Sequence, residues 1–281
     1  MDSLLAFFTE PLAHEFMQRA LLMSVIIASV CSIFSCFLVL KGWSLMGDAV
    51  SHAVLPGLAL AFVAGIPLAI GAFIAGLFCA LATGYLKENS RVKEDAVMGI
   101  VFSGMFALGL VLITKIETDV HLLHVLFGNI LGITQRDLIE AGIIALLCAV
   151  IMLVKRKDLM LYCFDPVHAG TIGLPVRLLH FGLLILLALT IVSALKAAGI
   201  ILVVAMLIAP GAIGFLLARS FDHMLAIALA ASLFSCISGT ILSYHFDTAT
   251  APLIVVIQAF LFLLALLGTS LGTATRTIIK A

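Results

Sequence analysis

The chain has 281 residues, of which 64% are hydrophobic and only 11% are charged. Soluble domains carry about 25% charged residues, so a water-soluble fold of this size could not cover so much apolar surface. Acidic and basic residues are equal in number, 15 of each, which leaves no net basic charge to attract nucleic acid. The composition therefore predicts an all-α integral membrane protein and excludes a nucleic-acid-binding role.

A transmembrane helix needs about 20 predominantly apolar residues, and apolar runs of this kind follow one another along the chain. The run at 53–86 is too long for one span, and Gly65-Ile66-Pro67 is expected to break it into two. The predicted spans are 20–40, the two parts of 53–86, 96–114, 138–154, 178–195, 200–218, 224–244 and 252–268. They predict a polytopic bundle of about 8–9 helices in a single domain, residues 1–281, the lower number applying if the piece after Gly47 is re-entrant.

Positive charge in short loops predicts which side of a membrane protein faces the cytoplasm. Basic residues gather at 87–93, at 155–157, at Arg219 and near the C-terminal end, and in the predicted topology all of them fall on one side. That side is expected to be cytoplasmic. The C-terminal end is then inside and, with nine spans, the N-terminal end is outside.

Asp48 and His52 stand at i and i+4 at the start of a predicted membrane helix. This spacing puts a carboxylate and an imidazole on one helix face, about one turn apart. An ionisable residue within a span is costly and indicates function, and these two donors suit first-row divalent metals, with Ser51 as a supporting group. The alternative is that Asp48 caps the helix and His52 is satisfied within the bundle. Two ligands are too few for a metal site, so a symmetric second copy would have to supply the rest.

The stretch at 159–176 is too polar to span a membrane and too apolar to lie free in water. It falls on the predicted cytoplasmic side and is predicted to be a docking segment. A short helix is expected to begin near Asp165 and Pro166, with proline at its first position, and to end at Gly170 or Gly173. Ala169 and Gly173 would then form one small-residue face that permits close approach of a partner.

Other polar residues give weaker indications. His121 and His124, at i and i+3 on the outer side, either attract metal at the mouth of a path or simply pack a short helix. His180 and His223 lie near predicted helix ends and are interpreted as interfacial residues. The six cysteines are scattered singly in apolar runs and are expected to be small core residues.

Four blocks, in this order, resemble the ABC-3 family of metal permeases. They are residues 40–57 (LKGWSLMGDAVSHAVLPG), 126–131 (LFGNIL), 164–174 (FDPVHAGTIGL) and 205–212 (AMLIAPGA). Within that family the chain is most similar to the manganese/iron permeases of the Sit/Yfe type, and zinc is a further candidate metal.

The resemblance implies a type II ABC importer-like permease of the bacterial inner membrane, formed by two permease chains that are copies or paralogues. It further implies two cytoplasmic ATPases and an extracytoplasmic metal-binding protein as partners. The metal is cargo, and no permanent cofactor is expected. Asp48 and His52 would line the metal path. The residues that would couple the permease to the ATPase are Phe164, Asp165, Pro166, Ala169 and Gly173.

Three further points bear on this interpretation. The chain contains no G-x-x-x-x-G-K-[ST] phosphate loop, so the ATPase would be a separate polypeptide. An ion-coupled secondary metal transporter is the alternative, although intramembrane acids besides Asp48 are scarce and no inverted repeat is evident. The nine-span topology also predicts that Asp48 lies near the cytoplasmic end of a span, whereas a gated site belongs nearer mid-depth.

Overall fold

The computed structural model describes residues 10–116 and 132–280, and the regular secondary structure in this part of the chain is helical throughout. Nine segments of the described chain are long and apolar enough to cross a membrane, which confirms the predicted all-α membrane fold. These segments are Glu15–Lys41, Met46–Ala64, Leu68–Lys87, Asp95–Lys115, Gln135–Val154, Val176–Leu195, Ala198–Leu217, Phe221–Phe246 and Thr250–Ser270.

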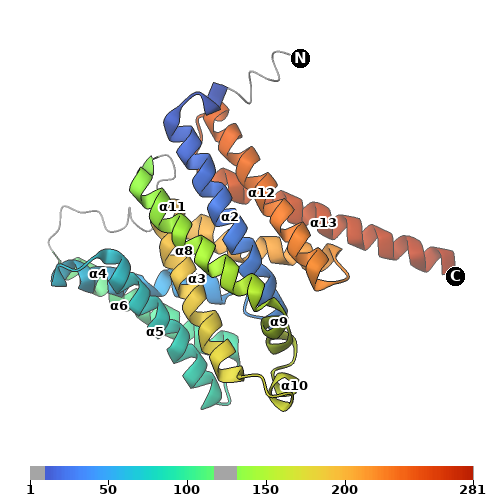
Figure 1. Ribbon diagram of the computed structural model, residues 1–281, viewed down its shortest axis with the longest axis horizontal. Coiled ribbons are helices and arrows are strands. Elements are labelled where there is room, and N and C mark those ends of the chain that lie inside the picture. The colour runs from blue at the N-terminus through green and yellow to red at the C-terminus, as the bar shows by residue number, and fades with distance from the viewer. Residues whose placement is uncertain (1–9, 117–131, 281) are drawn as a thin grey trace.

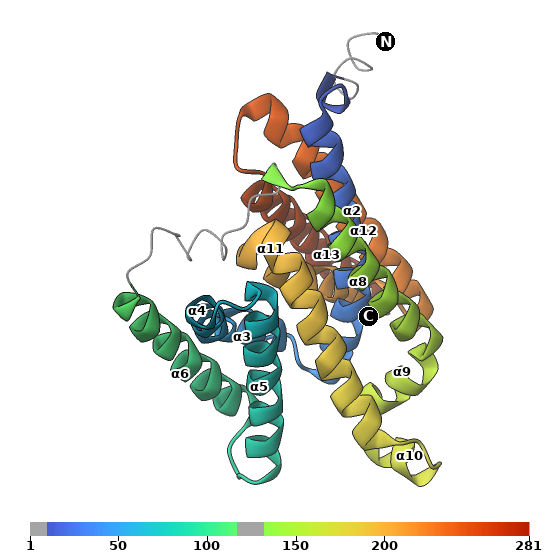
Figure 2. The same cartoon turned by 60° about the vertical axis from the view of Figure 1, so that its left-hand side comes forward.

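Figure 1 shows how the helices are arranged along the bundle. The elements are α2 (Glu15–Lys41), α3 (Met46–Ala53), α4 (Leu55–Ala64), α5 (Leu68–Glu88), α6 (Glu94–Lys115), α8 (Gln135–Val154), α9 (Arg156–Phe164), α10 (Pro166–Thr171), α11 (Val176–Leu217), α12 (Phe221–Phe246) and α13 (Thr250–Lys280). The helices α9 and α10 are too short to span and lie at one end of the bundle in both views (Figures 1 and 2).

Two of the elements differ from a simple straight span. Helices α3 and α4 meet at Val54 and together make one span; Pro56, which has no N–H to donate, follows the junction. Helix α11 contains two spans, because Gly199 adopts φ 74° and ψ 170° in its interior. Phe215, near the end of α11, borders a cavity together with Met160 of α9. The start of α11 follows α10, so both ends of α11 lie near α9 and α10. The chain therefore reverses direction at Gly199.

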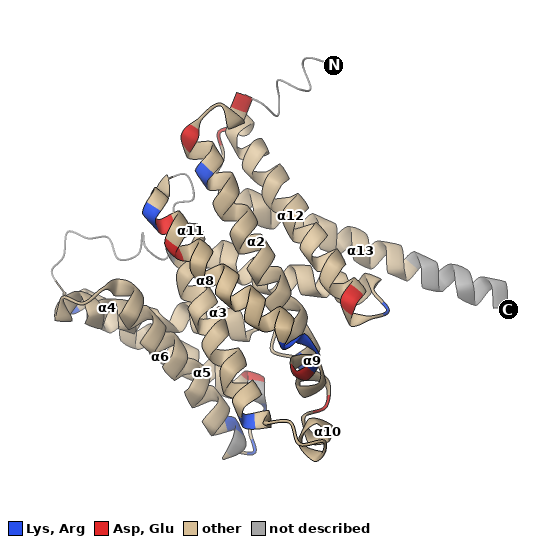
Figure 3. Ribbon diagram, in the orientation of Figure 1, with Lys and Arg blue, Asp and Glu red and all other residues tan. Residues whose placement is uncertain are grey.

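The loops predicted to be cytoplasmic lie at the end that carries α9 and α10, called the α9 end below. Arg156 at the start of α9 pairs with Asp222 at the start of α12, 3.0 Å apart. At the opposite end, His14 before α2 contacts the Tyr244 hydroxyl of α12 at 3.1 Å. Charged residues gather toward the two ends and leave the middle of the bundle nearly uncharged (Figure 3), as expected for helices surrounded by lipid.

Helix α2 forms the centre of the bundle, with Phe34 and Phe37 fully buried. It also contacts the backbone of α11 close to Pro210, which lies inside that helix. The Ser35 hydroxyl accepts a hydrogen bond from the Gly211 N–H at 2.8 Å and donates one to the Ile208 carbonyl at 3.1 Å. A Cβ on Gly211 would lie 2.5 Å from the Ser35 carbonyl oxygen, so the glycine of the 205–212 block allows the two helices to approach closely.

All six cysteines are buried and none forms a disulfide, which confirms the prediction of small core residues. Cys163 is the one that lies outside the nine spans. Burial raises the pKa of its thiol to about 12, against a smaller opposing effect of Lys41, so this thiol is uncharged at neutral pH.

Candidate metal path and docking segment

Helix α3 carries both predicted metal ligands. Asp48 lies in its first turn and its Oδ1 is 3.3 Å from Nε2 of His52, so the two side chains share a face as predicted. About a third of each side chain is exposed, 33% for Asp48 and 31% for His52. The N-cap of α3 is Leu45, which makes no side-chain capping bond. Asp48 is therefore not the N-cap, as the alternative interpretation required.

The imidazole of His52 is oriented by two phenylalanines of α6. Its ring centroid lies 6.1 Å from that of Phe102 and 5.3 Å from that of Phe106, the second in an edge-on arrangement. Nδ1 of His52 is buried without a hydrogen-bond partner, and such a group costs roughly 1–3 kcal/mol.

The pair lies level with the middle of three neighbouring spans. Cys79, midway along α5, donates from Sγ to the Ala49 carbonyl at 3.9 Å. Gly47 faces Leu207, midway along the second span of α11, and Phe102 and Phe106 are central in α6. Asp48 therefore lies near the end of its own span, as predicted, yet level with the middle of its neighbours. The turn before α3 is buried in the bundle, with Trp43 only 5% exposed. The α3–α4 span therefore begins part-way through the thickness of the bundle.

Glycines hold the α3–α4 span against its neighbours. A Cβ on Gly57 would lie 2.1 Å from the Gly71 carbonyl oxygen of α5, and one on Gly71 would lie 2.2 Å from the Gly57 oxygen. A Cβ on Gly109 of α6 would lie 2.8 Å from Leu55. Small residues allow membrane helices to approach this closely. The last glycine of the 40–57 block therefore serves helix packing.

The supporting residues are placed as follows. Ser51 is fully buried, and its hydroxyl donates to the Gly47 carbonyl of the same helix at 2.7 Å, so the hydroxyl is satisfied within α3. His121 and His124, like the 126–131 block, lie outside the described residues. In the described part of the chain, no group of three or more His, Cys, Asp or Glu side chains is close enough together to hold a metal ion. Within the described residues, Asp48 and His52 are therefore a pair without a third such side chain beside them.

The docking segment contains the predicted helix. The Asp165 side chain accepts a hydrogen bond from the His168 N–H at 2.9 Å and so caps α10, with Pro166 at the first position. The helix ends at Thr171, and Gly173 follows with φ 85°, a conformation that favours glycine. Start and end therefore agree with the prediction.

The predicted small-residue face of this helix was wrong. Ala169 is fully buried against its own chain, with 0% exposed, and Gly173 lies beyond the helix end. Three large apolar side chains are instead exposed, Phe164 at 77%, Val167 at 76% and Ile172 at 56%, beside the exposed polar residues His168 and Thr171. Ala169 occupies the inward face of α10. Only the opposite side of this short helix is therefore available to a partner.

Two histidines near helix ends have specific partners, which the sequence pattern did not indicate. Nδ1 of His180 in α11 is 2.7 Å from the hydroxyl of Tyr162 in α9. Nδ1 of His223 is 2.6 Å from the hydroxyl of Ser220, the N-cap of α12. His180 is therefore a partly buried residue near the start of α11 with a specific partner in α9.

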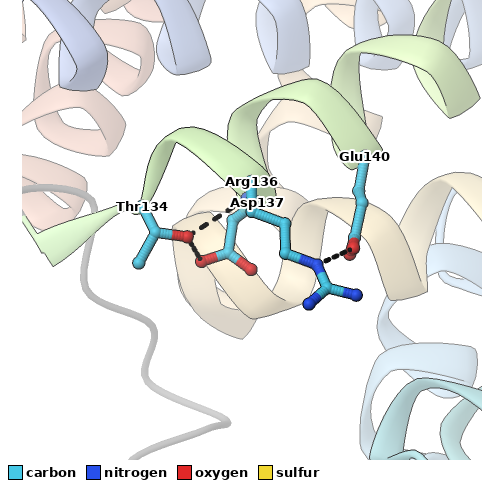
Figure 4. A network of polar contacts seen from close by, with 4 residues as sticks. All are labelled: Thr134, Arg136, Asp137 and Glu140. Atoms are coloured by element: carbon cyan, nitrogen blue, oxygen red, sulfur yellow. Dashed lines mark hydrogen bonds and ion pairs between the residues drawn. The ribbon is translucent and has the colours of Figure 1, made fainter.

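At the opposite end, α8 begins with the polar network of Figure 4. Thr134 accepts from the Asp137 N–H at 3.2 Å and contacts the Asp137 carboxylate at 2.5 Å. Arg136 pairs with Glu140 at 2.9 Å. Acidic groups in a first helical turn are stabilised by the helix dipole, so this network has a structural role at the start of α8.

Comparison with known proteins identifies the class. The sequence profile of the ABC 3 transport family matches residues 13–269. The chain is 62% identical to the chelated iron transport system membrane protein YfeD of Yersinia pestis, over 95% of this chain and 90% of YfeD. It is 54% identical to the manganese transport system membrane protein MntB of Synechocystis sp., over 92% of this chain and 85% of MntB.

Solved structures agree with this match. PsaBC from Streptococcus pneumoniae, in complex with Fab, superposes with a TM-score of 0.81 at 37% identity, covering 93% of this chain and 95% of that one. An inward-facing putative metal-chelate type ABC transporter has a TM-score of 0.71 at 15% identity, covering 89% of this chain and 85% of that one, and shares the fold. These matches favour the ABC importer over the ion-coupled secondary transporter, and they imply ATPase and binding-protein partners. The chain belongs to the ABC 3 transport family and is the membrane-spanning subunit of an ABC importer, with ATP hydrolysis carried by another subunit.

Proposed function

We propose that this permease imports iron and manganese across the bacterial inner membrane and that Asp48 and His52 line the metal path. The proposal rests above all on the position of this pair: a carboxylate and an imidazole 3.3 Å apart, level with the middle of three spans and one-third exposed. The names of the relatives, a chelated iron system and a manganese system, support the choice of metals.

The ligand set is completed by a second permease chain, either a copy or a paralogue. Two such chains related by a two-fold axis would present two carboxylates and two imidazoles to one ion. Mixed oxygen and nitrogen donors suit Mn²⁺, Fe²⁺ and Zn²⁺ alike, so the same site also accepts zinc. Ser51 contributes by fixing the backbone of α3 between Gly47 and the pair.

Energy enters at the α9 end, where a cytoplasmic ATPase dimer contacts the docking segment through Phe164, Val167 and Ile172. An extracytoplasmic metal-binding protein delivers the ion at the opposite end. The permease itself makes and breaks no covalent bond. ATP binding moves the docking segment, and the resulting shift of α3 breaks the ligand geometry around the metal and releases it.

The test is metal uptake by Asp48→Ala and His52→Ala variants. Each should lower uptake of radioactive manganese and iron by roughly tenfold or more, the loss usual when groups around a metal ion are removed. The variants should reach the membrane in wild-type amounts. Asp247→Asn is the matched control, because Asp247 is exposed with φ 49° and asparagine tolerates that conformation. Wild-type uptake by either alanine variant would overturn the assignment.

A further inference from the structure

A cluster of aromatic and basic side chains lies between the docking segment and the metal-site helix. Lys41 is the last residue of α2, Trp43 lies in the turn before α3, Tyr162 belongs to α9 and His180 to α11. Tyr162 and Trp43 are almost fully buried, at 3% and 5% exposed. The cluster therefore joins elements that are far apart along the chain and is covered by protein.

The contacts within the cluster are continuous. The Tyr162 hydroxyl and Nδ1 of His180 are 2.7 Å apart. The His180 ring meets the Trp43 ring edge-on, with 5.4 Å between centroids. Lys41 Nζ lies 4.2 Å from the centroid of the Tyr162 ring and 5.7 Å from that of Trp43, within the range of cation–π attraction. Lys41 Nζ also donates to the Tyr162 carbonyl at 3.5 Å.

Each end of the cluster is tied to a functional segment. Tyr162 precedes the exposed Phe164 by two residues in α9, directly before α10. Trp43 is held to α2 by its N–H, which donates to the Leu38 carbonyl at 2.8 Å. Its own carbonyl accepts from the N–H of Met46 at 3.0 Å. Met46 is the first residue of α3, and Asp48 lies in the same turn.

We propose that Tyr162, His180 and Trp43 are positioning residues that transmit movement of the docking segment to the Asp48–His52 pair. The proposal rests on the proposed function, in which the ATPase contacts α10. Packed protein interiors are dense and transmit displacement, and a buried hydrogen bond fixes which groups move together. A shift of α9 would carry His180 with it through the Tyr162 hydroxyl, displace Trp43 and tilt the first turn of α3.

The first test is Tyr162→Phe, which removes one hydroxyl and keeps the ring over Lys41. The complete complex of permease, ATPase and binding protein is reconstituted in lipid vesicles, and metal transported per ATP hydrolysed is measured. We expect the ATPase to remain bound at wild-type stoichiometry while this ratio falls by roughly fivefold or more, the lower range of coupling between distant sites. A residue with a merely structural role would lower both rates together and leave the ratio unchanged.

Tyr85→Phe is the matched control. Tyr85 lies near the same end of the bundle in α5, is 68% exposed and also loses a single hydroxyl. It should keep the wild-type ratio. His180→Gln, which retains a hydrogen-bonding group, should lie between Tyr162→Phe and the wild type.

The second test uses the wild-type sequence, in which Trp43 is the single tryptophan. Permease labelled with 5-fluorotryptophan and assembled with unlabelled partners gives one fluorine resonance. We expect this resonance to move when the ATPases are trapped with ATP and vanadate, and to stay in place in Tyr162→Phe. An unchanged wild-type resonance, or a Tyr162→Phe variant with the wild-type ratio, would overturn the link.

The proposed ATPase contact and the proposed link through Tyr162 can be tested separately. If Phe164→Asp keeps its ATPase, the contact with α10 is wrong whatever Trp43 does. If Phe164→Asp releases the ATPase and Tyr162→Phe still transports with the wild-type ratio, only the link is wrong.

Discussion

The pairs α3–α4 and α9–α10 are each two consecutive short helices whose small residues face inward, but they expose different kinds of side chain. In α3–α4 the small residues face neighbouring helices of the same chain, where the backbones of Gly57 and Gly71 touch. The ionisable pair, Asp48 and His52, remains partly exposed in α3, and Leu60 and Val63 are exposed near the end of α4. In α10 the small residue Ala169 is also turned inward, but the large apolar side chains of Val167 and Ile172 are exposed.

The difference between the α3–α4 span and the docking segment lies in which side chains each leaves without contacts within one chain. The α3–α4 span is mostly buried among other helices of the same chain and leaves an ionisable pair partly exposed. The docking segment lies at the α9 end, outside the nine spans, with apolar side chains that need cover. Exposed apolar groups rimmed by polar residues mark protein contact sites, so we expect the two segments to respond to different substitutions.

The largest effect is expected where α4 meets α5. In Gly57→Val, the new Cβ would lie 2.1 Å from the Gly71 oxygen, so the helices must separate. We expect a loss of roughly 3 kcal/mol or more, the upper range for overpacking, seen as aggregation after detergent extraction and as loss of transport. Gly104→Ala in α6 is the control, since nothing lies within 4 Å of its Cβ. Monodisperse, active Gly57→Val protein would disprove the close contact.

The next largest effect is expected on the exposed side of α10, which is proposed to contact the ATPase. Val167→Asp should release the ATPase, because a charge would be buried in the contact without a partner, typically at a cost of several kcal/mol. The measurement is co-purification of the ATPase with the permease. Val92→Asp makes the same chemical change in the 89–93 loop, where Val92 is 47% exposed, and should retain it. Release by both variants would show a general charge effect.

A smaller effect is expected on the inward side of α10. Ala169→Leu adds volume at a fully buried position, which usually costs about 1–3 kcal/mol. The segment should become more susceptible to proteolysis near residue 169, and ATPase binding should weaken as a consequence. Gly170→Ala provides the comparison, because its Cβ would meet only Val176 at an ordinary 3.8 Å. Equal protease resistance of Ala169→Leu and the wild type would show that the inward side is open.

The smallest effect concerns the cap of α10. Asp165→Ala removes the acceptor for the His168 N–H and should destabilise the helix by about 1 kcal/mol. Hydrogen exchange of the α10 amides should accelerate by roughly fivefold, since 1.4 kcal/mol corresponds to a factor of ten. Asp165→Asn should restore most of the protection because asparagine is an equally good cap. Unchanged exchange in Asp165→Ala would show that the bond contributes nothing.

The sequence by itself determined the features that depend on neighbours along the chain. The lengths of apolar runs predicted nine spans, because each helix must be long enough to cross the membrane by itself. Helical periodicity put Asp48 and His52 on one face, and Asp165 with Pro166 marked the start of α10. These signals lie within one or two turns of helix, so no knowledge of packing was needed.

Only the tertiary structure decided which residues from distant segments meet. It placed the metal-site pair level with the middle of three spans, turned Ala169 inward and joined Tyr162 to His180 and Trp43. Nothing local distinguishes a buried face of α10 from an exposed one, because a six-residue helix is too short for a periodic apolar pattern. The depth of Asp48 depends on where the turn at Trp43 enters the bundle, and that is fixed by packing against α5, α6, α9 and α11.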